Sequence, residues 1–280
     1  MAAPMVTDNI KTRHITPGHS PLALDFKEYW NGRELLYFLA WRDIKVRYKQ
    51  TAIGVIWLFL QPLLTTIILT VIFGSVARFD TGLLPYPIFV LSGIIPWLFV
   101  YNAVTMSSNS FVSNANLVTK VYFPRMIVPL SSVMACAFDL LVSFPIVILV
   151  ALFYKTAISW QIVLLPIFLV LLLVQTAAFG ILFSAINIRF RDVKFTLPFI
   201  LQVWMLASPI FYPSSLLPER WRYWYAINPL TGVIEGIRAS LFGADIDWQL
   251  LGVSSISIAV LVIVALFVFR RMEDAFADMI

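Results

Sequence analysis

A group of cations stands just before the first long apolar segment of the chain: Arg42, Lys45, Arg47 and Lys49. Side chains of this kind bind phosphate oxygens, in lipid headgroups or in a pyrophosphate, and they also bind acidic protein surfaces. Arg42, Lys45 and Lys49 have the spacing of one helical face. The residue types allow two roles, anchorage to anionic headgroups and contact with a partner or cargo, and the spacing favours neither.

The same stretch carries a second helical stripe made of rings and one aliphatic residue: Tyr37, Trp41, Ile44 and Tyr48. A helix with rings on one side and cations on the other fits the headgroup layer of a membrane. From Gly54 the chain is apolar over a length that spans a bilayer. We therefore predict a surface helix joined directly to a membrane-spanning helix, an arrangement that can pass movement from one to the other.

Residues suited to catalysis or metal binding are few and scattered. The two histidines, His14 and His19, lie in a polar tail without a third ligand. Asp139 is the one acidic residue deep in an apolar segment. We interpret it as hydrogen-bonded to a hydroxyl or amide of a neighbouring helix, with Ser143 or a residue across an interface as candidates, because a proton relay needs further ionisable groups along its path. The D-x-D sequence at 245–247 matches the metal–nucleotide pattern of glycosyltransferases only weakly.

These observations exclude most enzyme classes. The sequence has no Ser/His/Asp set, no Cys/His cluster and no Walker-type phosphate loop. We expect no catalytic residue, no metal site and no cofactor in this chain, so any ATP hydrolysis takes place in another one.

Aromatic and amide side chains gather in or near the ends of the apolar segments. For most rings the ordinary interpretation is the aromatic belt of the membrane interface. A subset can instead line a passage, because the C–H faces of sugars stack on aromatic rings and amides supply hydrogen bonds. The candidates for such a passage are Trp57, Phe59, Gln61, Trp97, Tyr101, Gln202, Trp204, Phe211 and Tyr212.

The composition is that of an integral membrane protein. Hydrophobic residues make up 60% of the chain and charged residues 12%, against about half and about a quarter in soluble domains. Hydropathy and length predict an all-α polytopic protein with six transmembrane helices. The predicted spans are 54–76, 86–106, 126–154, 160–188, 195–211 and 249–269.

The chain divides into a flexible tail (1–24), an amphipathic interface helix (25–52) and a transmembrane domain (53–280). With six spans, fifteen of the twenty Lys and Arg residues lie on the side of both termini. The positive-inside rule then makes both termini cytoplasmic. Because membrane sidedness explains the net charge of +5, we expect no nucleic-acid partner.

The segment between the fifth and sixth spans, 212–248, is too long for a tight turn and too apolar for a solvated loop. Prolines at 213, 218 and 229 break it into pieces, and 231–242 forms an amphipathic run. We predict short helices that re-enter or cap the outer leaflet. Glu235 and Arg238 are expected to be i, i+3 partners on one of them.

Four motifs in order resemble one family. They are RDIKVRYKQTAIGVIWLFLQP at 42–62, RFRDV at 189–193, SPIFYP at 208–213 and NPL at 228–230. Together they are similar to the membrane subunit of ABC-2 type polysaccharide exporters, the group of O-antigen, capsule and teichoic-acid export permeases. The resemblance extends from about Leu35 to the sixth span.

The resemblance implies a homodimer in the bacterial inner membrane that works with two cytoplasmic ABC ATPase subunits. ATP and Mg would be bound by those partners. The cargo would be a polyprenyl-pyrophosphate-linked glycan, as in lipopolysaccharide biosynthesis, and membrane lipids would surround the chain.

The resemblance also assigns roles to residues. The interface helix, the connector after the second span and the basic turn would couple to the ATPase through Arg42, Asp43, Lys45, Arg47, Lys49, Phe111, Asn114, Asn116, Lys120, Tyr122, Arg191 and Asp192. The first and fifth spans would line the conduit. The segment after the fifth span would form an outer gate with Trp221, Trp224, Asn228, Pro229, Glu235 and Arg238.

Three alternatives remain at this point. An ABC-2 exporter of another amphiphile, such as a drug or a lipid, shares every feature above. A membrane enzyme acting on lipid-linked sugars would need an acid/base pair, which the sequence does not offer. An ion channel or secondary transporter would carry more charge within its spans, and no internal repeat is visible.

Overall fold

The computed structural model describes residues 30–49, 54–76, 84–273 and 276. Within these ranges every regular element is a helix, which confirms the all-α class. The helices are α2 (Arg33–Lys49), α3 (Gly54–Leu69), η1 (Thr70–Val76), α4 (Tyr86–Ser113), α5 (Ala115–Lys120), α6 (Ile127–Ser143), α7 (Pro145–Phe153), η2 (Trp160–Leu164), α8 (Leu165–Arg189), α9 (Val193–Leu206), η3 (Ser214–Leu216), α10 (Glu219–Tyr225), α11 (Pro229–Phe242) and α12 (Trp248–Glu273).

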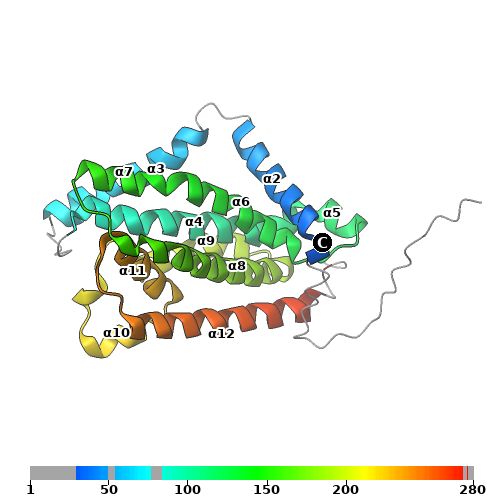
Figure 1. The fold of residues 1–280 in the computed structure, drawn as a ribbon. Coiled ribbons are helices and arrows are strands. Elements are labelled where there is room, and N and C mark those ends of the chain that lie inside the picture. The colour runs from blue at the N-terminus through cyan, green and yellow to red at the C-terminus, as the bar shows by residue number, and fades with distance from the viewer. Residues whose placement is uncertain (1–29, 50–53, 77–83, 274–275, 277–280) are drawn as a thin grey trace, which may run out of the picture.

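The core of the bundle is α4. It is buried along most of its length because α6, α8, α3, α9 and α11 all pack against it. Small residues allow a close approach, since a Cβ on Gly180 of α8 would overlap the hydroxyl of Ser107 of α4. Figure 1 shows α4, α6 and α8 running side by side, with α12 along the lower edge and α2 crossing at the upper right.

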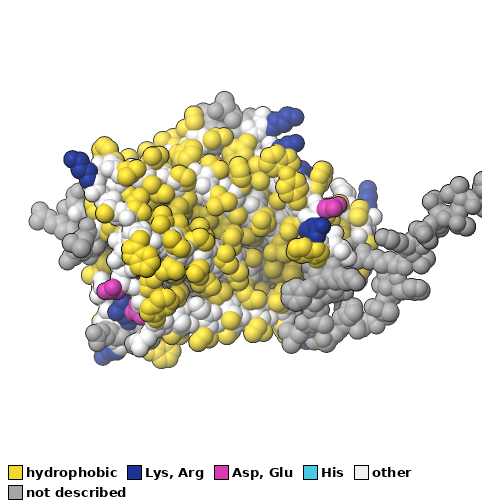
Figure 2. All heavy atoms as spheres, viewed as in Figure 1, with side chains coloured by type: hydrophobic (Ala, Val, Ile, Leu, Met, Phe, Trp, Pro, Cys, Tyr) yellow, Lys and Arg dark blue, Asp and Glu magenta, His cyan; other side chains and the backbone are white. Residues whose placement is uncertain are grey.

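The surface of this bundle is that of a protein surrounded by lipid. Figure 2 shows hydrophobic side chains covering the middle of the molecule, with Lys and Arg at its margins. Exposed side chains on α3, α8, α9 and α12 include Ile67, Ile167, Phe199 and Ile263. In water such a surface would be unfavourable, so the distribution identifies a polytopic membrane protein.

Five helical segments are long and apolar enough to cross a membrane: Val55–Gly74, Tyr86–Ser113, Ile127–Phe153, Trp160–Arg189 and Trp248–Glu273. They correspond to five of the six predicted spans. The third predicted span is divided at Phe144, because Pro145 starts a second helix. The six-span count remains a prediction.

The fifth predicted span, 195–211, is wrong at its end. The helix found there, α9, has 14 residues and stops at Leu206, which gives a length of about 21 Å at 1.5 Å per residue. A bilayer core is about 30 Å thick. Pro209 explains the early end, since it lacks a backbone donor and disfavours helical geometry at Ser208. The residues that follow, 207–211, are not helical, and 208–211 are buried.

The predicted short helices after this span are present as α10 and α11, at the end of the bundle opposite α5 (Figure 1). Asn228 caps the start of α11 by accepting from the N–H of Leu230, and Gly243 ends it at a φ of 76°. The amphipathic pattern of 231–242 does not leave a polar face in solvent, because nearly every residue of α11 is buried between α4, α8 and α12. The helix enters the bundle instead of covering it.

Gly236 provides the first testable prediction. A Cβ at this position of α11 would overlap the ring of Phe168, which is itself buried in α8. Gly236→Ala should therefore lower the stability of the purified protein by about 1–3 kcal/mol, the usual cost of overpacking. Thermal unfolding in detergent measures it.

Gly252→Ala is the matched control, because a Cβ there meets nothing within 4 Å. This change in the exposed face of α12 should be neutral or stabilise by up to about 1 kcal/mol. Equal melting temperatures for the two variants would contradict the proposed packing of α11 on α8.

Candidate functional site

The surface helix α2 is held to the bundle through Asp139. This carboxylate lies on α6, is 9% exposed, and receives a salt bridge from Nη1 of Arg47 and a hydrogen bond from the hydroxyl of Tyr48. Both donors come from the last turn of α2. We call Arg47, Tyr48 and Asp139 the Asp139 cluster. The cluster joins residues about ninety positions apart in the chain.

The cluster resolves an electrostatic conflict. A carboxylate buried in an apolar bundle is costly unless it is paired and hydrogen-bonded. Here a guanidinium balances its charge and a phenol donates to its other oxygen. Burial raises the pKa of Tyr48, so the hydroxyl keeps its proton and remains a donor. The guanidinium also lies against sulfur atoms of the bundle, 2.8 Å from Met106 Sδ and 3.6 Å from Cys136 Sγ.

Sequence reasoning identified Arg47 and Asp139 separately but did not pair them. The prediction that a hydroxyl of a neighbouring helix bonds Asp139 is confirmed by Tyr48 of α2. The candidate Ser143 is wrong, since its hydroxyl donates to the backbone carbonyl of residue 139. The signal for the true pairing was present. A lone acidic residue in an apolar span calls for a cation, and Arg47 is the cation of 42–49 that falls off the face shared by the other three.

A second contact between α2 and the rest of the bundle is made by Arg42, about one and a half turns before Arg47. The guanidinium of Arg42 donates to Oδ1 of Asp43 at 2.7 Å and to Oδ1 of Asn114 at 2.8 Å. Asn114 stands where α4 ends and α5 begins. This contact connects the surface helix to the connector that follows the longest buried helix.

The predicted separation of rings and cations on α2 is therefore only partly correct. Arg42 and Arg47 turn toward the bundle, whereas Lys45 and Lys49 are exposed. Tyr37 and Trp41 stack on one another at 6.4 Å and face outward, with the ammonium of Lys45 5.5 Å from the Trp41 ring. Propensity and spacing locate the helix, but they do not show which face the tertiary contacts select.

The connector and the basic turn lie at the same end of the bundle. Asn116, Lys120 and Tyr122 are exposed in and after α5, and Arg191 and Asp192 are exposed between α8 and α9. These side chains can touch a partner protein.

Phe111 differs from those exposed candidates because it is fully buried. Its ring lies 6.1 Å from that of Phe269 and 5.1 Å from that of Phe276. In this structure it therefore fixes the end of α12 to α4 and has no surface to offer a partner.

The nine predicted passage residues fall into two groups. Trp57 and Gln202 are exposed, on α3 and α9, and Phe59 and Gln61 of α3 are half-buried. The others pack inside the chain. Trp204 of α9 stands 5.7 Å from Trp97 and 4.6 Å from Phe179, and Trp97 lies 6.5 Å from Tyr101.

Phe211 and Tyr212, the last two passage candidates, belong to the segment after α9. The ring of Phe211 is buried and stacks on Phe73 at 5.4 Å, and Tyr86 donates to the carbonyl of Phe211 at 2.6 Å. Tyr212 accepts a hydrogen bond from the hydroxyl of Tyr225 on α10 at 2.9 Å. Burial raises the pKa of Tyr225, so this contact stays protonated. The side chains of Phe211 and Tyr212 therefore make contacts within this chain.

The predicted outer-gate residues also fall into an exposed group and a group that bonds within the chain. Trp221 and Trp224 are exposed on α10, and Pro229 is the first residue of α11. Asn228 accepts from the indole N–H of Trp204 at 2.8 Å and donates to Ser208 Oγ at 2.9 Å. The end of α9 and the start of α11 thus form one hydrogen-bonded unit.

The expected pair of Glu235 and Arg238 is confirmed, with an N–O distance of 3.8 Å. Arg238 is 3% exposed and donates to two backbone carbonyls, those of Phe89 and Ile210. A pair missed by sequence reasoning joins Arg222 of α10 to Asp247 at 3.1 Å. Asp247 belongs to the D-x-D sequence and also caps α12, so its role here is structural. In the described ranges no three His, Cys, Asp or Glu residues are placed to hold a metal.

Comparison with known proteins gives a consistent result. Residues 34–242 match the protein family described as ABC-2 type transporter. The chain is 29% identical over 249 residues to the O-antigen export system permease protein RfbA of Klebsiella pneumoniae, covering 88% of this chain and 95% of that protein.

Two more distant relatives agree. The O-antigen export system permease protein RfbA of Myxococcus xanthus is 27% identical, over 91% of this chain and 98% of its own length. The polysialic acid transport protein KpsM of Escherichia coli is 25% identical, over 84% of this chain and 92% of its own length.

The Asp139 cluster makes a quantitative prediction. Asp139→Leu leaves Arg47 without its buried counterion and should lower stability by about 3–5 kcal/mol. The double variant Arg47→Met/Asp139→Leu removes both charges and should recover most of that loss, because an apolar pair of similar volume replaces the ions. Thermal unfolding of the wild type, both single variants and the double variant in detergent forms the cycle. Additive losses would contradict a direct pairing.

Alanine substitutions of two passage candidates, Trp204 and Trp57, should lower the stability of the protein by different amounts. Trp204→Ala removes a ring packed on Trp97 and Phe179 and a hydrogen bond to Asn228, so we expect a loss of about 3–5 kcal/mol. Trp57→Ala alters a side chain that is 52% exposed and should stay within about 0.5 kcal/mol of the wild type. A similar loss of stability in both variants would contradict the exposed position of Trp57 on α3.

Proposed function

This chain belongs to the ABC-2 type transporter family, and we propose that it is the membrane subunit of an ATP-driven exporter of polysaccharide linked to a polyprenyl pyrophosphate. The relatives reported above are permeases and transport proteins for O-antigen and polysialic acid. Their similarity covers nearly the whole of this chain. The membrane in question is the cytoplasmic membrane of a bacterium.

The observation that carries the proposal is the attachment of α2. A surface helix ends in two side chains that reach into the bundle and bind a buried carboxylate. Movement of α2 must then move α6 or break a buried ion pair, and breaking the pair costs about 3–5 kcal/mol. This is the linkage a transporter needs when its energy is released in another protein.

The energy source in the proposal is a separate ATPase. The sequence has no phosphate loop, so two ABC ATPase subunits would bind ATP and Mg and dock on this chain. They would meet the end formed by α2, α5 and the 189–192 turn, where Lys45, Lys49 and Lys120 are exposed. That end is the cytoplasmic one in this proposal, together with both termini.

The conduit in the proposal lies between two copies of the chain. Only 11% of the residues in an 18-residue stretch of Val55–Gly74 are buried within one copy, and α9 exposes Phe195, Phe199 and Val203. Two such faces, with Trp57 and Gln202 among their residues, can enclose a passage when a second copy covers them. Stacking on rings lets a glycan slide without a deep binding site.

An exporter of another amphiphile, such as a drug or lipid, has no comparable support. The named relatives are permeases and transport proteins for O-antigen and polysialic acid, which favours a polysaccharide cargo.

The direct test is deletion of the gene in its native cell. We expect loss of the surface polysaccharide and accumulation of lipid-linked glycan on the inner leaflet, with both defects reversed by the wild-type gene. The glycan is measured by extracting the lipid fraction and by labelling intact cells. A deletion strain with normal surface polysaccharide and no accumulated intermediate would refute the proposal.

A second prediction concerns coupling. Arg47→Met/Asp139→Leu, which should fold, is expected to reduce export about five-fold or more while the assembled complex still hydrolyses ATP, because the link from α2 to α6 is gone. Export in cells and ATPase activity of the purified complex are measured in parallel. Glu34→Ala, an exposed change in the first turn of the same helix, serves as the control. Unchanged export in the double variant would show that the cluster is structural only.

A further inference from the structure

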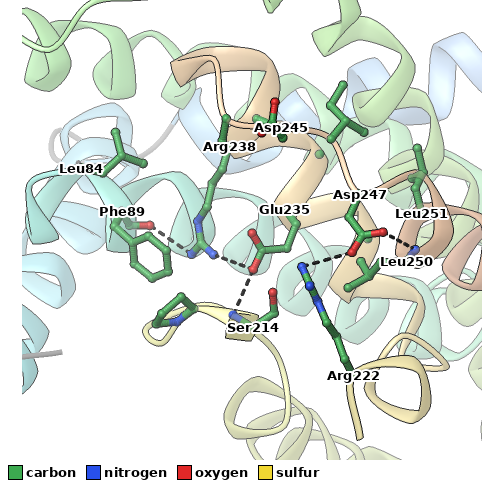
Figure 3. Close-up of a pocket in the computed structure, with 16 residues that line it drawn as sticks. Leu84, Phe89, Ser214, Arg222, Glu235, Arg238, Asp245, Asp247, Leu250 and Leu251 are labelled. Atoms are coloured by element: carbon green, nitrogen blue, oxygen red, sulfur yellow. Dashed lines mark hydrogen bonds and ion pairs between the residues drawn. The ribbon is translucent and has the colours of Figure 1, made fainter. Parts of the chain in front are cut away.

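A cavity of about 180 Å³ lies at the end of the bundle that carries α10 and α11. It is lined by residues of α4, α10, α11 and α12 and of the segments that join them (Figure 3). Pockets for drug-sized ligands measure about 300–1,000 Å³. The cavity therefore has room for a single ring with its substituents and none for an acyl chain.

Arg238 offers a buried donor to this cavity. Its Nη2 donates to the carbonyls of Ile210 at 2.7 Å and Phe89 at 3.1 Å, and its guanidinium lies 3.6 Å from the centre of the Phe89 ring. Its Nη1 is different. It is 3.8 Å from Oε1 of Glu235, too far for a hydrogen bond, and finds no hydrogen-bond partner among the residues that the structure describes.

A second pair faces the same space. Nη2 of Arg222 lies 3.1 Å from Oδ2 of Asp247, while its buried Nε also has no hydrogen-bond partner in the described part of the chain. Figure 3 shows Arg238 pointing toward Glu235 and Arg222 toward Asp247, with the two pairs side by side on the cavity wall. Buried N–H groups without acceptors are rare in folded proteins, and the two side chains that carry them here, Arg222 and Arg238, both line this cavity.

The chemistry of the lining selects the ligand. Each cation already faces a carboxylate, so the two pairs leave little net charge, but their spare N–H donors and carboxylate lone pairs can still form hydrogen bonds. Asp245 adds a negative charge, which disfavours an anion. Leu84, Leu250 and Leu251 supply apolar surface. A ligand that both donates and accepts hydrogen bonds, carries no charge and has C–H faces satisfies all of these groups.

We propose that this cavity binds one neutral sugar unit. The inference rests on the proposed function for the source of the sugar, the exported polysaccharide, and takes the ligand class from the cavity itself. The site lies within one copy of the chain, beside the exposed rings of Trp221 and Trp224 on α10. It would hold a sugar residue of the polymer at the end of the bundle away from α2.

A zwitterionic phospholipid headgroup is the competing occupant. Its phosphate would need a free cation, whereas the structure pairs Arg222 with Asp247 and places Arg238 beside Glu235. The neutral sugar is therefore favoured, and the headgroup becomes an outcome of the test.

Saturation-transfer NMR on the full chain in phosphatidylcholine nanodiscs tests the proposal. The probes are the methyl pyranosides of glucose, galactose and mannose, methyl glucuronide, inorganic phosphate and glycerophosphoethanolamine. We expect binding of at least one neutral pyranoside and of none of the charged probes. Binding of glycerophosphoethanolamine alone, or of no neutral pyranoside, would overturn the proposal.

Two variants locate the site. Ala244 lines the cavity and is exposed at its edge, so Ala244→Trp should fill it and weaken pyranoside binding at least ten-fold. Ser215→Trp places the same ring on a nearby exposed position outside the lining and should leave binding unchanged. Equal binding by both variants would place the sugar elsewhere and refute the assignment.

Complementation of the deletion strain separates this inference from the proposed function. If the wild-type gene restores surface polysaccharide but no pyranoside binds, the cavity assignment fails and the exporter stands. If the deletion leaves polysaccharide export intact while a pyranoside binds and Ala244→Trp abolishes binding, the cavity is a sugar site and the proposed function fails.

Discussion

The interaction on which the structure depends is the pairing of a buried carboxylate with a cation from outside the bundle. Asp139 lies on α6 among apolar residues, where an unpaired charge would be strongly unfavourable. Arg47 and Tyr48 reach it from α2. A surface helix held only by its apolar face would have no fixed position at the membrane interface. This one has a fixed position, because leaving it would expose a charge to the apolar interior.

At the opposite end of the molecule the buried charge is a cation instead of a carboxylate, and it too is satisfied by groups from other segments. Arg238 is the buried charge, and it is satisfied mainly by the carbonyls of Phe89 and Ile210 and by the ring of Phe89. Those carbonyls belong to the start of α4 and to the non-helical segment after α9, whose backbone groups need partners in an apolar setting. One guanidinium therefore fixes α11, α4 and the end of α9 together. Because α9 ends at Leu206, before Pro209, the carbonyl of Ile210 lies outside any helix and accepts from Arg238.

The sequence predicted the helical class, most of the spans and the region of α10 and α11, because hydropathy and length act locally. It did not predict the partners of Arg47, Asp139 or Arg222, since each pairing joins residues far apart in the chain. The burial of α11 was missed for a related reason. Its sequence alternates small and large residues around Gly232 and Gly236, and only the packing of Phe168 and Ser254 against those glycines shows that both faces are covered. The roles of the exposed candidates, such as Lys45 and Trp57, stay predictions because they depend on partners.

The Asp139 cluster also changes how α2 is expected to act. The sequence suggested a lever that passes movement from the surface helix to the span following it, α3. Yet few residues of α3 are buried, whereas α2 binds α6 through Asp139 and the α4–α5 junction through Asn114. Since α4 and α6 pack tightly together, a force on α2 acts on the buried core as a body. Few residues of α3 and α9 are buried, so we expect these two helices to shift relative to that core while α2 stays attached to it.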